Sequence, residues 1–191
     1  MIRTSYQKYK FLLFFLLFIV AIGFFAGLYY NYRLDNSLKN NIFDCFFDLI
    51  DRKKVLNANW YHLSIISFVP IFSYILIGPF FSVFALFYEG FSAGMMFSLF
   101  FGKKTLKGLV YVIIYTISAK LIFLALLLGM TIISFKIFKN ILKKHKMQDY
   151  YLKMYAIFKC NIAFMLLATL NEILLVPILN RLCCYFSFLI L

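Results

Sequence analysis

Three ionisable side chains, Glu89, Lys120 and Glu172, each interrupt a long apolar run of this sequence. A charge within a membrane-spanning segment is costly, so such residues usually pair with one another or line a pathway for protons or ions. Asn171 directly precedes Glu172 and adds an amide that can donate a hydrogen bond to a carboxylate. These four residues are the candidate intramembrane polar cluster, and ion pairing or proton binding is the chemistry that they could carry.

Counting residues from the turns predicts that the three charges lie at one depth. Glu89 lies 13 residues before Gly102. Lys120 lies 12 residues after Gly108, so an antiparallel hairpin brings the two side chains level, and a similar count across the next hairpin adds Glu172. Two carboxylates and one ammonium leave one negative charge over, which is met either by protonation of a carboxyl group or by an amide and a backbone donor. The cluster is either a salt bridge that fixes helix packing or a site that couples helix position to a partner or a proton.

Several residue patterns of common enzyme and metal sites are missing from this sequence. It contains no HExxH motif, no glycine-rich phosphate loop after a strand and no pair of aspartates within an apolar run. The four cysteines have no metal-ligand spacing. His62 lies near a predicted interface and His145 in a lysine-rich run, so neither is placed to activate a nucleophile. We therefore expect no catalytic residues, no metal and no cofactor.

The composition places the chain in a lipid bilayer. Of its 191 residues, 64% are hydrophobic and 21% are aromatic, which is more apolar surface than a soluble domain of this length could bury. The formal net charge is +13, but the lysines and arginines lie almost entirely between the apolar runs. That distribution is typical of contact with anionic lipid headgroups and argues against a nucleic-acid partner.

The lengths of the apolar runs predict an all-α integral membrane protein in which residues 1–191 form a single membrane domain. The predicted architecture is a bundle of five transmembrane helices, at about 11–30, 60–77, 79–101, 109–134 and 157–180. Gly78 and Pro79 divide the run 60–101 into two spans, because glycine can turn and proline suits the first position of a helix. A re-entrant hairpin is the alternative for that run.

Two segments between the spans have a helical period. Residues 41–51 place aspartates on one face and aromatic residues on the other, which predicts an amphipathic helix on the membrane surface or on the rim of the bundle. The basic segment 136–153 carries four lysines along one helical face: Lys136, Lys139, Lys143 and Lys146. These lysines either contact anionic headgroups or form a solvated face.

An odd number of spans places the two termini on opposite sides of the membrane. Basic residues number ten on one side and nine on the other, so the balance barely decides the orientation. The dense lysine run at 136–159 favours a cytoplasmic N-terminus, with the C-terminus outside the cell membrane.

Two stretches carry short motifs built on glycine and proline. Gly23 and Gly27 form a GxxxG pair, which can let another helix approach closely. The stretch "IGPFFSVFALFYEGFSAGMMFSLFFGKKTLKG" has a glycine at a helix start, a Leu-Phe pair, two glycines four residues apart and a Gly-basic turn, at Gly78, Leu86, Phe87, Gly90, Gly94, Gly102 and Gly108. In "NEILLVPIL", Glu172 is followed five residues later by Pro177.

Both stretches resemble the stage II sporulation protein M family, in which the second forms a C-terminal signature. The N-terminal stretch "RTSYQKYKFLLFFLLFIVAIGFFAGLYYN" is also similar to this family, so the likeness covers most of the chain. The chain departs from the pattern at residues 118–120, where members often have proline beside a polar residue. It also departs at Glu89, where some members have a basic or neutral polar residue.

The resemblance implies a bacterial integral membrane protein of the engulfment stage of endospore formation. The family member is regarded as a scaffold for the stage II sporulation proteins D and P, which degrade peptidoglycan outside the membrane. We therefore expect a non-enzymatic scaffold whose partners are the lipid bilayer and peptidoglycan hydrolases. The alternative is a transporter or channel subunit with Glu89, Lys120 and Glu172 along a polar path. The sequence leaves open whether the chain forms a homo-oligomer.

Overall fold

The computed structural model describes residues 2–48, 52–75, 77–102, 120–142, 147–175 and 177–178. Every regular element within these ranges is helical, as expected for an all-α protein. In chain order the elements are α1 (Ile2–Arg33), α2 (Asn36–Asp48), α3 (Arg52–Phe72), α4 (Gly78–Gly102), α6 (Leu121–Leu142), α7 (Met147–Leu170) and the π-helix η2 (Asn171–Leu175).

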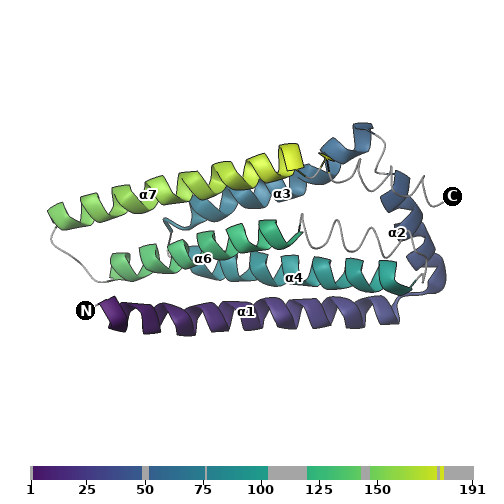
Figure 1. The fold of residues 1–191 in the computed structure, drawn as a ribbon, viewed down its shortest axis with the longest axis horizontal. Helices are drawn as coiled ribbons and strands as arrows, with labels where there is room; N and C mark the ends of the chain where they lie inside the picture. Colours follow the sequence, from purple (N-terminus) through teal and green to yellow (C-terminus); the bar gives the residue numbers. More distant parts are fainter. Residues whose placement is uncertain are drawn as a thin grey trace.

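Five of the described helices lie lengthwise in a bundle, and α2 lies across one end of it (Figure 1). α1 packs along α4, and α4 also contacts α3 and α6. α7 packs against α3 and α6, and η2 continues α7 directly. α4 is therefore the central helix, with α1 on one side and the other helices of the bundle on the other.

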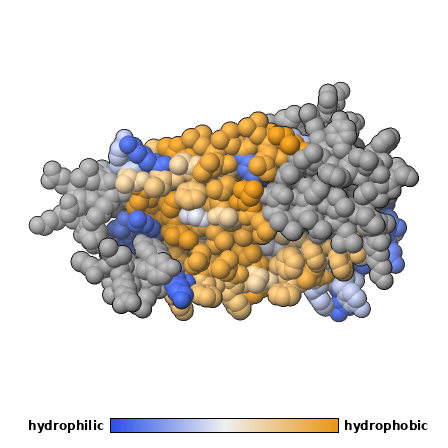
Figure 2. Space-filling view, in the orientation of Figure 1, coloured by the Kyte–Doolittle hydropathy of each residue, from blue (hydrophilic) through white to orange (hydrophobic). Residues whose placement is uncertain are grey.

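Four of the described helices are long and apolar enough to cross a membrane, which indicates a membrane protein. They cover Lys10–Arg33, Gly78–Gly102, Leu121–Leu142 and Tyr155–Leu175. The apolar part of α3 is shorter, His62–Phe72, because this helix begins in the polar sequence RKKVLNAN. Figure 2 shows the corresponding surface, which is largely hydrophobic in the middle and hydrophilic toward both ends.

Several helices begin or end at residues other than the predicted ones. α3 starts at Arg52 instead of near residue 60, and it ends at Phe72, where the amide of Ile75 donates back to the Phe72 carbonyl at 2.9 Å and begins the turn into α4. α6 continues past residue 134 to Leu142, so the exposed Lys136 and Lys139 extend this helix, in agreement with the helical period of the basic segment. The amphipathic segment predicted at 41–51 corresponds to α2, which begins at Asn36.

Some of the sequence-based predictions lie outside the described residues. They concern the first part of the predicted span 109–134, the end of the predicted span 157–180, Gly108, Lys143 and Lys146.

The apolar core lies between the helices on the inner side of α4. Ile66 and Val69 of α3, Leu86 of α4, and Phe123 and Leu127 of α6 are all at most 1% exposed and belong to one cluster. Many large apolar side chains on the outer faces are exposed, as expected where lipid tails surround a helix bundle.

Glycines bring α1 and α4 into backbone contact. A Cβ added at Gly23 or Gly27 would collide with the backbone carbonyl of Phe87 or Phe91 on α4. The converse holds on α4, where a Cβ at Gly90 or Gly94 would collide with the carbonyls of Val20 and Phe24. One turn further on, the Asn31 amide donates to Ser98 Oγ at 2.8 Å. Along each helix, two glycines and a polar residue therefore follow one another at four-residue spacing. The two helices run parallel, with these residues in register.

The other motif residues have varied surroundings. Gly78 and Pro79 are buried at the start of α4, and a Cβ at Gly78 would meet the backbone of Phe72, so the chain folds tightly back on α3 at this point. Gly102 ends α4 with nothing within 4 Å of an added Cβ. Pro177 is half-buried.

Gly94→Ala is expected to destabilise the protein by about 1–3 kcal/mol, because a methyl group at this position pushes α1 away from α4. Thermal unfolding of the purified protein in detergent measures the effect. Gly102→Ala is the matched control and should change stability little, because no atom of another described helix lies within 4 Å of its new methyl group. Equal unfolding temperatures for the two variants would contradict this account of the α1–α4 contact.

Candidate functional site

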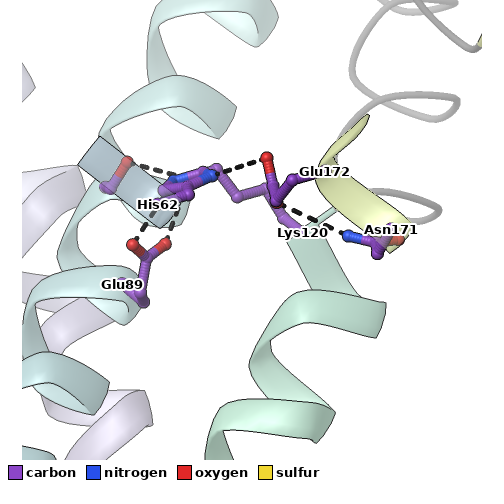
Figure 3. Close-up of polar contacts among 6 residues, drawn as sticks. His62, Glu89, Lys120, Asn171 and Glu172 are labelled. Atoms are coloured by element: carbon purple, nitrogen blue, oxygen red, sulfur yellow. Dashed lines mark hydrogen bonds and ion pairs between the residues drawn. The ribbon is translucent and has the colours of Figure 1, made fainter. Parts of the chain in front are cut away.

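A cluster of polar side chains lies inside the bundle, with each of its ionisable members on a different element (Figure 3). His62 belongs to α3, Glu89 to α4 and Glu172 to η2, and Lys120 lies at a π-helical turn immediately before α6. Glu89 is close to the middle of α4, about 16 Å along the helix from Gly78 and about 20 Å from Gly102. The cluster therefore lies about halfway between the ends of the bundle.

Lys120 joins α4 and α3. Its Nζ donates to Glu89 Oε2 at 3.1 Å and to Ser92 Oγ at 3.4 Å, and it lies 3.0 Å from His62 Nε2. These contacts link the start of α6 to two neighbouring helices through one ammonium group.

His62 joins the two carboxylates. Its Nδ1 lies 3.1 Å from Glu172 Oε2, and its Nε2 lies 3.4 Å from Glu89 Oε1. The imidazole thus stands between the two glutamates, as Figure 3 shows. Asn171 Nδ2 reaches Glu172 Oε1 at 3.5 Å, the long limit of a hydrogen bond.

The positions of the protons follow from the partners of His62. An ammonium group has donors only, so at 3.0 Å from Lys120 the Nε2 atom acts as the acceptor. The ring proton in this arrangement is therefore assigned to Nδ1, which lies 3.1 Å from Glu172 Oε2.

Burial makes these contacts strong. The side chains of Glu89 and Glu172 are 1% exposed, that of Lys120 is 8% exposed and that of His62 is 13% exposed. An ion removed from water to this extent must be compensated by a close counter-charge and hydrogen bonds, because its desolvation costs several kcal/mol. The cluster therefore ties α3, α4, the start of α6 and η2 together.

Two local features orient the side chains. The ring of Phe123 on α6 stacks on His62 with centroids 4.7 Å apart and an angle of 17° between the planes, which restricts rotation of the imidazole. The π-helix η2 places the consecutive residues Asn171 and Glu172 both in the interior. Single π-helical turns of this kind are often found at functional sites.

The structure brings together the residues that the sequence singled out, but through an intermediate that the sequence analysis missed. Glu89 and Lys120 pair directly, and Glu172 is joined to them by His62. His62 lies in the middle of its helix, because α3 begins at Arg52, ten residues before it, and not near residue 60.

Metal-ion chemistry has no support from the described residues. Among them, no group of three or more His, Cys, Asp or Glu side chains is arranged to hold a metal ion. In the cluster, the Lys120 ammonium fills the space between Glu89 and His62 that a cation would need.

Comparison with known proteins returned nothing. Neither a scan against protein-family models nor searches of curated proteins and of solved structures found a match to this chain. The proposed function therefore rests on the contacts in the cluster and on the motif residues.

Lys120→Ala is expected to cost about 3–5 kcal/mol of stability, because it leaves the buried Glu89 carboxylate without its ammonium partner. Glu172→Gln should cost less, about 1–3 kcal/mol, because an amide oxygen can still lie against His62 Nδ1 and the net charge of the cluster is reduced. Unfolding of the purified protein in detergent with added denaturant provides both values. A larger loss for Glu172→Gln than for Lys120→Ala would show that the charge balance has been assigned incorrectly.

Proposed function

We propose that this chain is a non-enzymatic scaffold of a bacterial cell membrane that anchors or organises peptidoglycan hydrolases during engulfment in endospore formation. The observation that carries the proposal is that the ionisable side chains of the cluster contact one another at 3.0–3.4 Å, which suits a group that fixes helices in place. The resemblance to the stage II sporulation protein M family supplies the partners: proteins such as the stage II sporulation proteins D and P. A bilayer with anionic headgroups is the second partner, next to the exposed Lys136 and Lys139.

The motif residues support the resemblance. Gly90 and Gly94, two residues that carry the likeness, form the face of α4 against which α1 packs, and Gly78 forms the tight entry into α4. Their spacing thus serves a packing purpose in this bundle, so a shared motif is consistent with a shared architecture.

We further propose that α3 completes a five-span topology with the N-terminus in the cytoplasm and the C-terminus outside. In support, α3 lies lengthwise beside α7 and contacts α4, α6 and α7, like a member of the bundle (Figure 1). In this orientation, α2 belongs to the outer end and the turn between α3 and α4 to the cytoplasmic end.

The orientation can be tested by fusing a reporter that is active only in the cytoplasm to either terminus. We expect a strong signal from the N-terminal fusion and none from the C-terminal fusion. A strong signal from both fusions would indicate an even number of spans and would exclude the five-span topology.

The scaffold role predicts partner contacts at the outer end of the bundle. A photo-crosslinking residue in place of Leu38 on α2 should capture a cell-wall hydrolase in the native membrane, as identified by mass spectrometry. Ile75 in the turn between α3 and α4 is the matched control, because it has the same 47% exposure but lies at the other end of the bundle. Equal capture from both positions, or a nucleotide-binding subunit as the main product, would contradict the scaffold role.

One observation favours a transporter or channel subunit as the second candidate. Asn161 on α7 and Ser134 on α6 are at most 1% exposed, and Asn161 is about 16 Å along the helix from Glu172. A polar path would need such groups between the cluster and one end of the bundle. In that case each single neutralisation of Glu89, Lys120 or Glu172 would abolish transport, whereas a scaffold would tolerate neutralisation of a balanced pair.

A further inference from the structure

We propose that His62 is a proton-binding site halfway across the bundle, in which a bound proton displaces the Lys120 ammonium from the same ring nitrogen. This inference goes beyond the scaffold role and does not depend on it. It rests on the fact that His62 has the partners of two protonation states at once.

The first set of partners suits the neutral ring. Nδ1, which then carries the ring proton, lies 3.1 Å from Glu172 Oε2, and Nε2 accepts from Lys120 at 3.0 Å. In this state Nε2 also faces Glu89 Oε1 at 3.4 Å. Nε2 of the neutral ring and Glu89 Oε1 are both acceptors, so no hydrogen bond joins them in this state.

The second set of partners suits the imidazolium ion. In that ion both ring nitrogens are donors, and a carboxylate oxygen already lies next to each of them: Glu172 Oε2 at Nδ1 and Glu89 Oε1 at Nε2. The ring of Phe123, stacked at 4.7 Å, adds a π face that attracts a cation. No rotation of the imidazole is needed to reach this state.

The charge of the cluster favours uptake of one proton. Among the described residues, Glu89 from α4, Glu172 from η2 and Lys120 at the start of α6 are charged groups that face His62. With a neutral ring these groups sum to one negative charge, and with an imidazolium they sum to zero. A buried net charge is costly, so a proton that enters from water and binds Nε2 removes this cost.

Lys120 has other acceptors when it leaves Nε2. Its Nζ already contacts Glu89 Oε2 at 3.1 Å and Ser92 Oγ at 3.4 Å, both on α4. The lysine keeps its proton throughout, one proton is gained by the ring, and no covalent bond other than the new N–H bond changes. Protonation therefore weakens the contact between α3 and the start of α6 and strengthens the contact between α3 and α4.

Nuclear magnetic resonance of nitrogen-15-labelled histidine tests the proposal on the full-length protein in lipid nanodiscs. The sequence has two histidines, so His145→Gln leaves His62 as the only signal. As the pH is lowered over the range in which the protein stays folded, we expect the neutral Nδ1–H form to convert to a ring with both nitrogens protonated. A ring that stays neutral over this range, or that carries its neutral proton on Nε2, would overturn the proposal.

Three variants in the same background separate displacement of the lysine from simple titration. Lys120→Met should raise the ratio of imidazolium to neutral imidazole at a fixed pH by at least about tenfold, because the competing cation is gone. Glu89→Gln should lower this ratio by about tenfold, because the acceptor for Nε2–H loses its charge. Ser92→Ala should lower it by a smaller factor, because the displaced ammonium loses an acceptor.

The small change at Ser92 keeps the test decisive if Lys120→Met does not fold. In that case a lower ratio in both Ser92→Ala and Glu89→Gln supports the proposal. An unchanged ratio in Ser92→Ala, or in a folded Lys120→Met protein, would show that lysine and proton do not compete and would overturn it.

Discussion

Desolvation of the Glu89 and Glu172 carboxylates is the constraint on which the arrangement of the bundle depends. Each of them is 1% exposed, so each requires a counter-charge or a donor at contact distance. Lys120 meets the first requirement and His62 meets the second, and the two partners come from different helices. Because no single helix carries both members of a pair, Glu89 is compensated only when α4 meets the start of α6, and Glu172 gains its imidazole partner only when η2 meets α3.

α1 is held by a different kind of interaction. Its contact with α4 consists of glycines that allow backbone to touch backbone, together with one hydrogen bond between Asn31 and Ser98. Glu89, Lys120, His62 and Glu172 take no part in these α1–α4 contacts. The central helix α4 takes part in both interactions, since Gly90 and Gly94 face α1 while Glu89 and Ser92 reach Lys120.

The sequence predicted those features that depend on local spacing and missed those that depend on tertiary register. Residue counts from the turns placed Glu89 and Lys120 at one depth because the rise per residue of a helix is constant. His62 was missed because its depth depends on where α3 begins, and polar residues at 52–59 concealed the start of that helix. The π-helix at Asn171 and Glu172 could not be predicted either, since helix-helix contacts decide whether two consecutive residues turn inward. The GxxxG pair at Gly23 predicted a close helix contact but not that its partner would be α4.

The glycine contact between α1 and α4 and the cluster around His62 lie in different parts of the bundle, and protonation directly affects only the second part. The α1–α4 pair is held by backbone contact at Gly23, Gly27, Gly90 and Gly94. His62, in contrast, has two sets of partners within 3.4 Å, and the choice between them changes whether α3 is held more closely to α4 or to the start of α6. Any movement that follows protonation should therefore occur between α3, α6 and α7, with α1 and α4 as the frame against which they move. For a scaffold, this would allow a change in protonation to alter one side of the bundle while the other side keeps its position in the membrane.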